Sequence, residues 1–281
     1  MTDSPQLASL GDMVEIAPGV RMNRLGLGTY RADEGPEVEN EVATALSLGY
    51  RLVDTAAAYD NEHSVGRVLR ASGIPRKELF VTTKVWNTDQ GFARTHAAFD
   101  KSLATLDVGY IDLYLVHWPV PSLMGETWRA MEEILATGRT RAIGVCNHLT
   151  HHLDRLLGEA TVPPAVNQFE FHPRLQQPDL TAYCREHAIT MQAWAPVMRG
   201  RANLVPELVE IAQRHDKTPA QVSIRWILQQ GITTIPKSVH SERVAENADI
   251  YDFELSEQEM AVISRLDTGQ RIGSHPDHYQ F

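Results

Sequence analysis

Four side chains that could donate or accept a proton, or stabilise the charge that proton transfer creates, lie at or just after the ends of apolar runs in this chain. They are Asp54, Tyr59, Lys84 and His117. Lys84 is the most unusual, because it belongs to the β-branched run LFVTTKVW and a buried ammonium is costly unless it is paired. Taken alone, Lys84 could simply reach water. Asp54 could equally cap a helix, and His117 could bond a carbonyl group.

Polar residues end the later apolar runs as well. They are Asn147, Asn167 with Gln168, Trp194, and Lys237 with Ser238. Each has a structural explanation of its own, such as an asparagine in a turn, but polar ends on run after run are hard to produce by accident. In a barrel of parallel strands the carboxyl ends carry the active site. The pattern therefore predicts that these side chains meet on one rim.

The apolar runs alternate with amphipathic stretches. We expect strands at residues 23–29, 50–56, 79–86, 110–118, 141–147, 164–170, 189–195 and 232–238. Strand starts recur about every 25 to 30 residues, the length of one strand-plus-helix unit. The gap before the last strand is longer, because 206–215 adds a second helix there.

Helix signals fill the intervals between the predicted strands. Residues 36–49 and 127–138 repeat an apolar face at helical spacing. The stretch 218–231 has Thr218 as N-cap, Pro219 at the first helical position and Gly231 past the end.

Eight such units favour a closed (β/α)8 TIM barrel, with an N-terminal β-hairpin at residues 13–22 and two extra helices. We expect one barrel domain over residues 1–281, with residues 1–10 as a flexible N-terminus. An open doubly wound sheet is the structural alternative. Its G-x-G-x-x-G nucleotide fingerprint is broken here, because Arg31 stands where the third glycine belongs in GLGTYR.

Composition narrows the class of protein. The chain has 281 residues, 43% of them hydrophobic, and a net charge of −10. The acidic balance argues against a nucleic-acid partner or an anionic membrane surface. Neither a membrane-spanning run nor a signal peptide is expected. Cys146 and Cys184 are the only cysteines, so we expect no disulfide framework and a cytoplasmic location.

Several motifs, taken together, resemble the aldo-keto reductase family. They are LGLGTYR, RLVDTAAAYDNE, LFVTTKVW, IDLYLVHWP, IGVCNH, VNQFE and IPKSVHSERVAEN, and they run in the family's order from about Leu25 to the end. AWAPVMRG and the tail RIGSHPDHYQF most resemble the bacterial 2,5-diketo-gluconate reductase type. The resemblance implies a (β/α)8 barrel, bound NADPH, and reduction of aldehydes or ketones to alcohols.

The resemblance also implies roles for the four ionisable residues. Tyr59 would be the general acid, and Lys84 the cation that lowers the pKa of its phenol from about 10. Asp54 would pair with Lys84, and His117 would polarise the carbonyl oxygen. Two alternatives remain: a phosphate-binding barrel isomerase or lyase, in which Lys84 forms a Schiff base, and a non-catalytic nicotinamide-binding regulatory subunit. The intact set of four argues against the regulatory subunit.

For the nicotinamide end of the cofactor, the resemblance implies that Asn147 and Gln168 bond the carboxamide while Trp194 stacks on the ring. Most relatives have tyrosine at the stacking position, and a tryptophan could instead fill the core. Cys146 replaces the family's usual serine and His148 its usual phenylalanine. A thiol is a weak donor, so Cys146 is the least secure of the carboxamide contacts.

For the adenosine end, barrels usually bind phosphate after strands seven and eight. Lys237, Ser238 and Arg243 would surround the 2′-phosphate and favour NADPH over NADH. Glu246 and Asn247 would meet the adenine end, and Val239 belongs to the same contact segment. Ser241 would cap the following helix. His240 stands where some relatives have arginine, which would loosen the hold on the phosphate.

In the family that the motifs resemble, bulky ligands go with longer loops after the fourth strand and longer tails, so the short connection here implies a small carbonyl substrate, such as a sugar ketoacid or a methylglyoxal-like compound. Trp86, Trp118 and the tail through His278 and Phe281 would form the pocket wall, although both tryptophans could equally be packing residues. The HLTHH cluster has helical spacing and invites a zinc interpretation, but no cysteine or carboxylate beside it completes a site. We therefore expect no metal, and a monomer.

Overall fold

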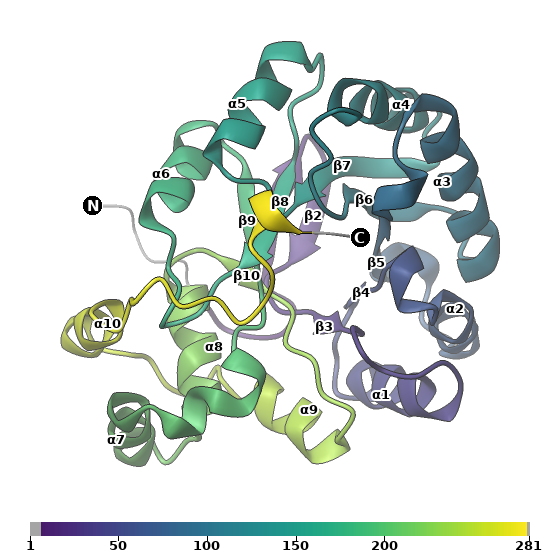
Figure 1. Ribbon diagram of the computed structural model, residues 1–281. Helices are drawn as coiled ribbons and strands as arrows, with labels where there is room; N and C mark the ends of the chain where they lie inside the picture. Colours follow the sequence, from purple (N-terminus) through teal and green to yellow (C-terminus); the bar gives the residue numbers. More distant parts are fainter. Residues whose placement is uncertain (1–6, 280–281) are drawn as a thin grey trace.

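The computed structural model describes residues 7–279, so the predicted flexibility of residues 1–6 lies outside the described residues. Eight parallel strands follow one another around a closed sheet (Figure 1). The last strand returns to the first through a parallel bridge between Leu25 and Thr234. Strand bounds are β3 Leu27–Gly28, β4 Leu52–Asp54, β5 Phe80–Val85, β6 Ile111–Val116, β7 Thr140–Cys146, β8 Val166–Glu170, β9 Thr190–Trp194 and β10 Thr233–Thr234.

Helices surround this sheet, as Figure 1 shows. The order along the chain is strand, helix, strand, helix, so the predicted (β/α)8 barrel is confirmed. Helix α7 precedes α8 between β9 and β10, and α10 follows α9; these are the two extra helices. Helix bounds are α1 Pro36–Ser47, α2 Glu62–Ala71, α3 Phe92–Leu106, α4 Met124–Ala136, α5 Thr150–Glu159, α6 Pro178–Glu186, α7 Pro206–His215, α8 Pro219–Gln229, α9 Ser241–Ala248 and α10 Glu257–Ser264.

The predicted hairpin forms from β1 (Met13–Ala17) and β2 (Val20–Asn23). Ile16, Val20 and Met22 of the hairpin share a buried cluster with residues near the beginnings of the barrel strands. Those residues are Leu52, Phe80, Leu113, Ala142 and Val166. The hairpin therefore closes the amino-terminal end of the barrel with apolar side chains.

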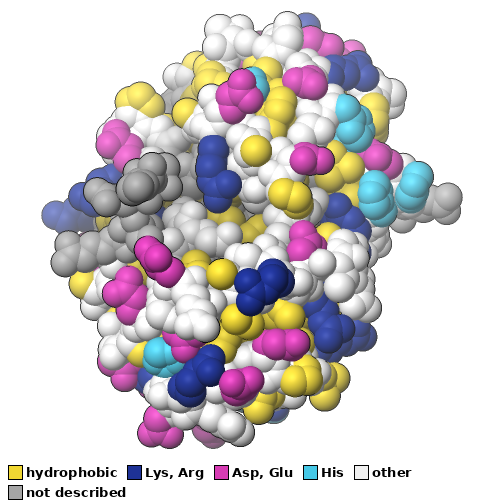
Figure 2. Space-filling model, turned by 90° about the vertical axis from the view of Figure 1, so that its left-hand side faces the viewer, with side chains coloured by type: hydrophobic (Ala, Val, Ile, Leu, Met, Phe, Trp, Pro, Cys, Tyr) yellow, Lys and Arg dark blue, Asp and Glu magenta, His cyan; other side chains and the backbone are white. Residues whose placement is uncertain are grey.

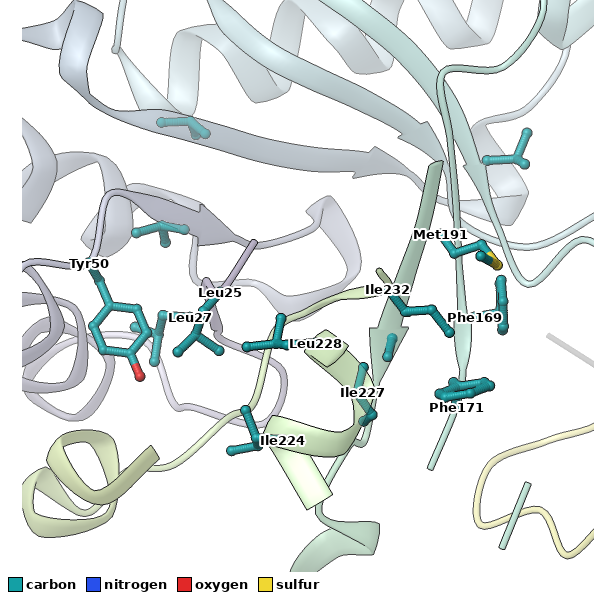
Figure 3. Close-up of a cluster of buried hydrophobic side chains, with 14 of the residues drawn as sticks. Leu25, Leu27, Tyr50, Phe169, Phe171, Met191, Ile224, Ile227, Leu228 and Ile232 are labelled. Atoms are coloured by element: carbon teal, nitrogen blue, oxygen red, sulfur yellow. The ribbon is translucent and has the colours of Figure 1, made fainter. Parts of the chain in front are cut away.

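The barrel has two hydrophobic cores, one inside the sheet and one between the sheet and the helices. Successive side chains of a strand point to opposite faces, so every second residue points into the barrel and the residues between them pack against the helices. Val53, Val81 and Phe169 belong to this outer cluster, together with apolar faces of the helices. Figure 3 shows part of the cluster, where Ile224, Ile227 and Leu228 of α8 lie with side chains from the strands.

Capping signals are correct for α8 and wrong for α9. The Thr218 side chain accepts the N–H of Gln221, and Pro219 begins the helix as predicted. In α9 the cap is His240, and Ser241 is the first helical residue, with its hydroxyl 3.4 Å from that of Thr44. A serine at the start of a helical pattern was therefore not enough to identify the N-cap residue.

Charged side chains of both signs are present on the surface (Figure 2). On the face shown in Figure 2, basic and acidic side chains are interspersed. Among the described residues, every helix is too short or too polar to cross a bilayer.

Candidate active site

Lys84 lies inside the barrel wall and does not reach water. Its side chain is completely buried, and its Nζ donates to Oδ1 of Asp54 at 2.5 Å and to the carbonyl oxygen of Thr55 at 2.9 Å. The two residues meet because β4 and β5 are adjacent and both side chains point inward at the carboxyl ends. Each charge needs the other, since an unpaired buried charge is strongly destabilising.

Tyr59 stands on a 3-10 turn, η1 (Ala57–Tyr59), directly after β4. The Nζ of Lys84 also donates to the Tyr59 hydroxyl, at 3.3 Å. Burial and the negative charge of Asp54 nevertheless raise the pKa of Tyr59 well above its usual value. The prediction of a lowered pKa was therefore wrong for the protein without bound ligands: burial is the largest cause of the rise, and the charge of Asp54 adds to it. Part of Tyr59 still faces the cavity described below.

His117 follows β6 and lies between two aromatic rings. Its ring meets the edge of Tyr59 at 5.5 Å and that of Trp86 at 5.1 Å, between centroids. Burial and the nearby Lys84 ammonium lower the pKa of His117 well below its usual value. The imidazole is therefore neutral at physiological pH. Its Nδ1 is buried and has no hydrogen-bond partner among the described residues.

Gln168 links the ion pair to the far side of the barrel. Its Nε2 donates to Oδ2 of Asp54 at 2.8 Å and to Oε1 of Gln192 at 2.7 Å, while its own Oε1 accepts from the Cys146 thiol at 3.5 Å. Burial raises the pKa of Cys146, so its sulfur stays protonated. The network fixes the orientation of the carboxylate that holds Lys84.

Asn147 connects His117 to Trp194. Asn147 adopts a left-handed conformation (φ 60°) just after β7, and its Nδ2 donates to the carbonyl oxygen of His117 at 3.0 Å. The Trp194 Nε1 donates to Oδ1 of Asn147 at 2.9 Å. The indole at the end of β9 is thus held by a hydrogen bond and remains partly exposed.

A cavity of about 1070 Å³ opens at this rim. It brings together ten of the predicted residues: Asp54, Tyr59, Trp86, His117, Trp118, Cys146, Asn147, Gln168, Trp194 and Lys237. Lys84 lies behind this lining and contacts it through Asp54 and Tyr59. The carboxyl ends of the strands therefore form one site, as predicted, but Asn167 lies outside the lining and donates to the carbonyl oxygen of His148 at 2.9 Å.

The remaining predicted residues lie beyond Lys237 and outside the lining of the cavity. The Ser238 N–H donates to the Glu41 carboxylate at 3.1 Å, and Glu246 accepts the Thr218 hydroxyl at 2.6 Å. Arg243 is exposed on α9. Val239 is partly buried and Asn247 is buried. Contacts of this group with a cofactor remain predictions.

An aromatic wall borders the cavity. Trp118 stacks on Tyr279 of the tail, with centroids 4.2 Å apart, and Trp86 meets the edge of Tyr279 at 6.1 Å. The tail thus reaches the cavity as predicted, but His278 is not part of the lining; its ring stacks on that of His275. Phe281 lies outside the described residues.

The C-terminal tail crosses the rim of the barrel (Figure 1), and Glu170 holds it there. This buried carboxylate accepts the backbone N–H groups of Ile272 at 2.5 Å and Gly273 at 3.1 Å. Burial alone would raise the pKa of Glu170, but hydrogen bonds from His172 and these amides lower it. A Cβ at Gly273 would lie 2.4 Å from the Trp194 ring, so only glycine lets the tail approach the indole this closely.

Sequence reasoning missed several ionisable residues at or near the cavity. Arg31 and Arg199 line it, and Glu41 lies behind Lys237 and Ser238. Arg199 follows β9 in a left-handed conformation (φ 54°), which no sequence signal indicated. Glu41 could have been found, because it interrupts the apolar face of α1.

Comparisons with known proteins agree with the geometry. The aldo/keto reductase family model matches residues 24–268. The glyoxal reductase of Bacillus subtilis is 48% identical over 273 residues, which cover 97% of this chain and 99% of that protein. The methylglyoxal reductase DkgA of Escherichia coli is 43% identical, covering 95% and 98%.

Solved structures show the same barrel. A mutant of Gox0644 in complex with NADPH superposes with a TM-score of 0.89 at 39% identity, covering 96% of this chain and 99% of that one. A structure assigned to a 2,5-diketo-D-gluconic acid reductase B gives 0.88 at 34%, covering 98% and 96%. The chain therefore belongs to the aldo/keto reductase family, the carbonyl-reducing, NADPH-dependent enzymes that its motifs resemble.

Proposed function

We propose that this enzyme reduces small 2-oxoaldehydes, such as glyoxal and methylglyoxal, to hydroxycarbonyl compounds. The observation that carries the proposal is the buried Lys84–Asp54 pair with Lys84 Nζ 3.3 Å from the Tyr59 hydroxyl, at the floor of the cavity. Relatives at 43–48% identity carry the names glyoxal and methylglyoxal reductase. The aromatic wall of Trp86, Trp118 and Tyr279 favours a small substrate over a bulky one.

The donor set of the cavity fits NADPH. Trp194 offers a partly exposed ring for stacking, and the oxygens of Asn147 and Gln168 keep lone pairs for an amide beside the protein bonds they already accept. Lys237 and Arg199 supply positive charge for phosphates. NADPH, when bound, supplies the hydride.

Tyr59 would deliver the proton. Its raised pKa means that the phenol keeps its proton until the substrate oxygen becomes more basic than a phenolate, as an alkoxide is. The proton then passes from the Tyr59 Oη to that oxygen. The phenolate left behind lies beside the Lys84 ammonium, which stabilises it and permits reprotonation from water.

His117 would orient the carbonyl group. Because its imidazole is neutral, it can donate one N–H to the substrate oxygen without adding a charge to the site. The ring is held between Tyr59 and Trp86, so this donor is already oriented before substrate binds.

The Schiff-base alternative is disfavoured by the surroundings of Lys84. Its amine already contacts three oxygens, those of Asp54, Thr55 and Tyr59, and it lies behind the lining of the cavity. A substrate carbonyl would have to displace these partners. Family membership likewise favours reduction.

Consumption of NADPH in the presence of methylglyoxal or glyoxal, followed by nicotinamide absorbance, tests the proposal. We expect turnover with both compounds, and a loss of about 10²- to 10⁴-fold in Tyr59→Phe. Tyr183→Phe is the matched control, because that hydroxyl bonds Asp154 on the outer surface. Absence of turnover with 2-oxoaldehydes, or an unimpaired Tyr59→Phe, would overturn the assignment.

We also propose that the chain works as a single barrel domain, as a monomer, and in the cytoplasm. Support comes from the continuous ring of strands and from the acidic composition with two free cysteines. Light scattering on the purified protein should give a mass close to 31.4 kDa; about twice that mass would indicate a dimer.

A further inference from the structure

A cluster of histidines and one aspartate joins α5 to the C-terminal tail. His151 and His152 lie in the first turn of α5, and Asp277 lies in the 3-10 turn η5 (Pro276–His278). The His151 Nε2 is 3.0 Å from Oδ1 of Asp277, and the His152 Nε2 is 3.3 Å from the same oxygen. Figure 2 shows histidine side chains gathered toward one edge of the molecule.

These distances suit a metal ion. One ligand atom from each of the three residues lies within 4.8 Å of the other two. Two ligand atoms that each bind zinc at about 2.0–2.1 Å in a tetrahedral site lie roughly 3.3 Å apart. Imidazole nitrogen and carboxylate oxygen are ordinary zinc ligands. His275 lies nearby, but its Nδ1 accepts the backbone N–H of Asp277 at 3.3 Å, so water would supply the fourth ligand.

The surroundings allow a cation at this place. The Asp277 carboxylate offsets the positive end of α5, which by itself would repel a cation. The Arg271 guanidinium is the nearby charge of the same sign, and it also interacts with the more buried Glu170.

Metal binding requires a change of tautomer at His152. Its Nδ1 accepts the N–H of Leu149 at 3.2 Å, so in the metal-free protein Nε2 carries the proton. When Nε2 binds a metal, its proton passes to water and Nδ1 takes up a proton from water. The number of protons on the imidazole stays the same. The bond from Leu149 is then lost, which gives the bound state a signature of its own.

We propose that His151, His152 and Asp277 form a binding site for a divalent transition metal such as Zn²⁺, completed by water. The bound metal links the tail to α5. Because Tyr279 of the same tail stacks on Trp118 at the cavity, the metal also stabilises the tail in this position.

Titration of chelator-treated protein without a histidine tag with ZnCl₂, followed by calorimetry, tests the site. We expect one Zn²⁺ per chain with micromolar affinity, weakened more than about 100-fold in Asp277→Asn and in His151→Gln, which remove a ligand. His187→Gln is the matched control, since this exposed histidine stacks on Tyr183 outside the cluster. Absence of saturable binding, or equal affinity in Asp277→Asn, would overturn the proposal.

Hydrogen exchange gives a second readout that does not depend on activity. With Zn²⁺, the amides of residues 272–279 should exchange at least tenfold more slowly, and the Leu149 amide should exchange faster. Neither change should occur in Asp277→Asn. If Zn²⁺ does not change the exchange rates of the tail amides in the wild-type protein, a bound ion does not link the tail to α5.

Discussion

The two ends of the barrel interior are built from the same strands but differ in the side chains that they bury: one end is apolar and the other is ionic. At the amino-terminal end, Leu52 and Phe80 point inward into an apolar cluster beneath the hairpin. Two residues later on β4 and four residues later on β5, Asp54 and Lys84 point inward as a buried ion pair. Because side chains on a strand alternate with a period of two, all four lie on the same face of the sheet.

The closed, apolar end therefore contributes mainly to the stability of the fold, and the open end carries the groups for catalysis. Apolar burial stabilises the closed end without any requirement for orientation. The open end contains charges that would be costly if unpaired, and it keeps them because each has a partner with defined geometry. We therefore expect substitutions at the open end to change turnover first and those at the hairpin end to change the free energy of unfolding first.

The strongest test removes the cation at the open end. Lys84→Met should lower kcat by about 10²- to 10⁴-fold, because the phenolate of Tyr59 loses its stabilising charge. NADPH affinity, measured by fluorescence titration, should change little, since Lys84 lies behind the lining. The exposed Lys77→Met serves as control. Normal turnover in Lys84→Met would remove Lys84 from the mechanism.

The reverse test acts at the hairpin end. Phe80→Ala should lower the free energy of unfolding by about 3–5 kcal/mol through lost burial and a cavity. The folded fraction should keep kcat within about twofold, since Phe80 lies below the ion pair on the same strand. Urea unfolding and kinetics on the same preparation measure both. A large loss of kcat would mean that the two ends are coupled.

A pH test concerns Glu41, a buried carboxyl group at the open end that forms no ion pair among the described residues. Burial raises the pKa of Glu41 to about 8. Between its usual pKa and about 8 the folded state binds more protons than the unfolded state, so this group makes stability fall as pH rises. Glu41→Gln should remove a decrease of a few kcal/mol between pH 5 and 8. Urea unfolding at both pH values checks this, and an unchanged slope would contradict the assigned pKa.

The smallest expected effect concerns the tail. Glu170→Gln keeps the shape but removes the charge that holds the amides of Ile272 and Gly273. We expect the KM for the carbonyl substrate to rise several-fold, while kcat stays within about twofold of the wild-type value. The reason is that the tail borders the cavity but takes no part in proton transfer from Tyr59. Faster hydrogen exchange of residues 272–279 should accompany it. A fall in kcat with unchanged KM would assign Glu170 a different role.

The sequence predicted the elements well and their ends less well. All eight strands, the hairpin and the extra helix at 206–215 were found from periodicity and turn residues, because these are properties of short segments. The second extra helix, α10, was expected but not located in the sequence. The N-cap of α9 was misplaced, and the left-handed backbone at Asn147 and Arg199 was not foreseen. Backbone conformation at single residues depends on contacts that a local pattern does not contain.

The sequence alone determined where the ionisable groups stand along the strands and that they face one rim. Only the tertiary structure decided their electrostatics and their distant partners. Burial, and after it the charge of Asp54, raise the pKa of Tyr59, and Asp277 contacts His151 across 126 positions of the chain. Local order follows from the backbone geometry of neighbouring residues, whereas burial and charge pairing depend on which remote segments the closed barrel brings together.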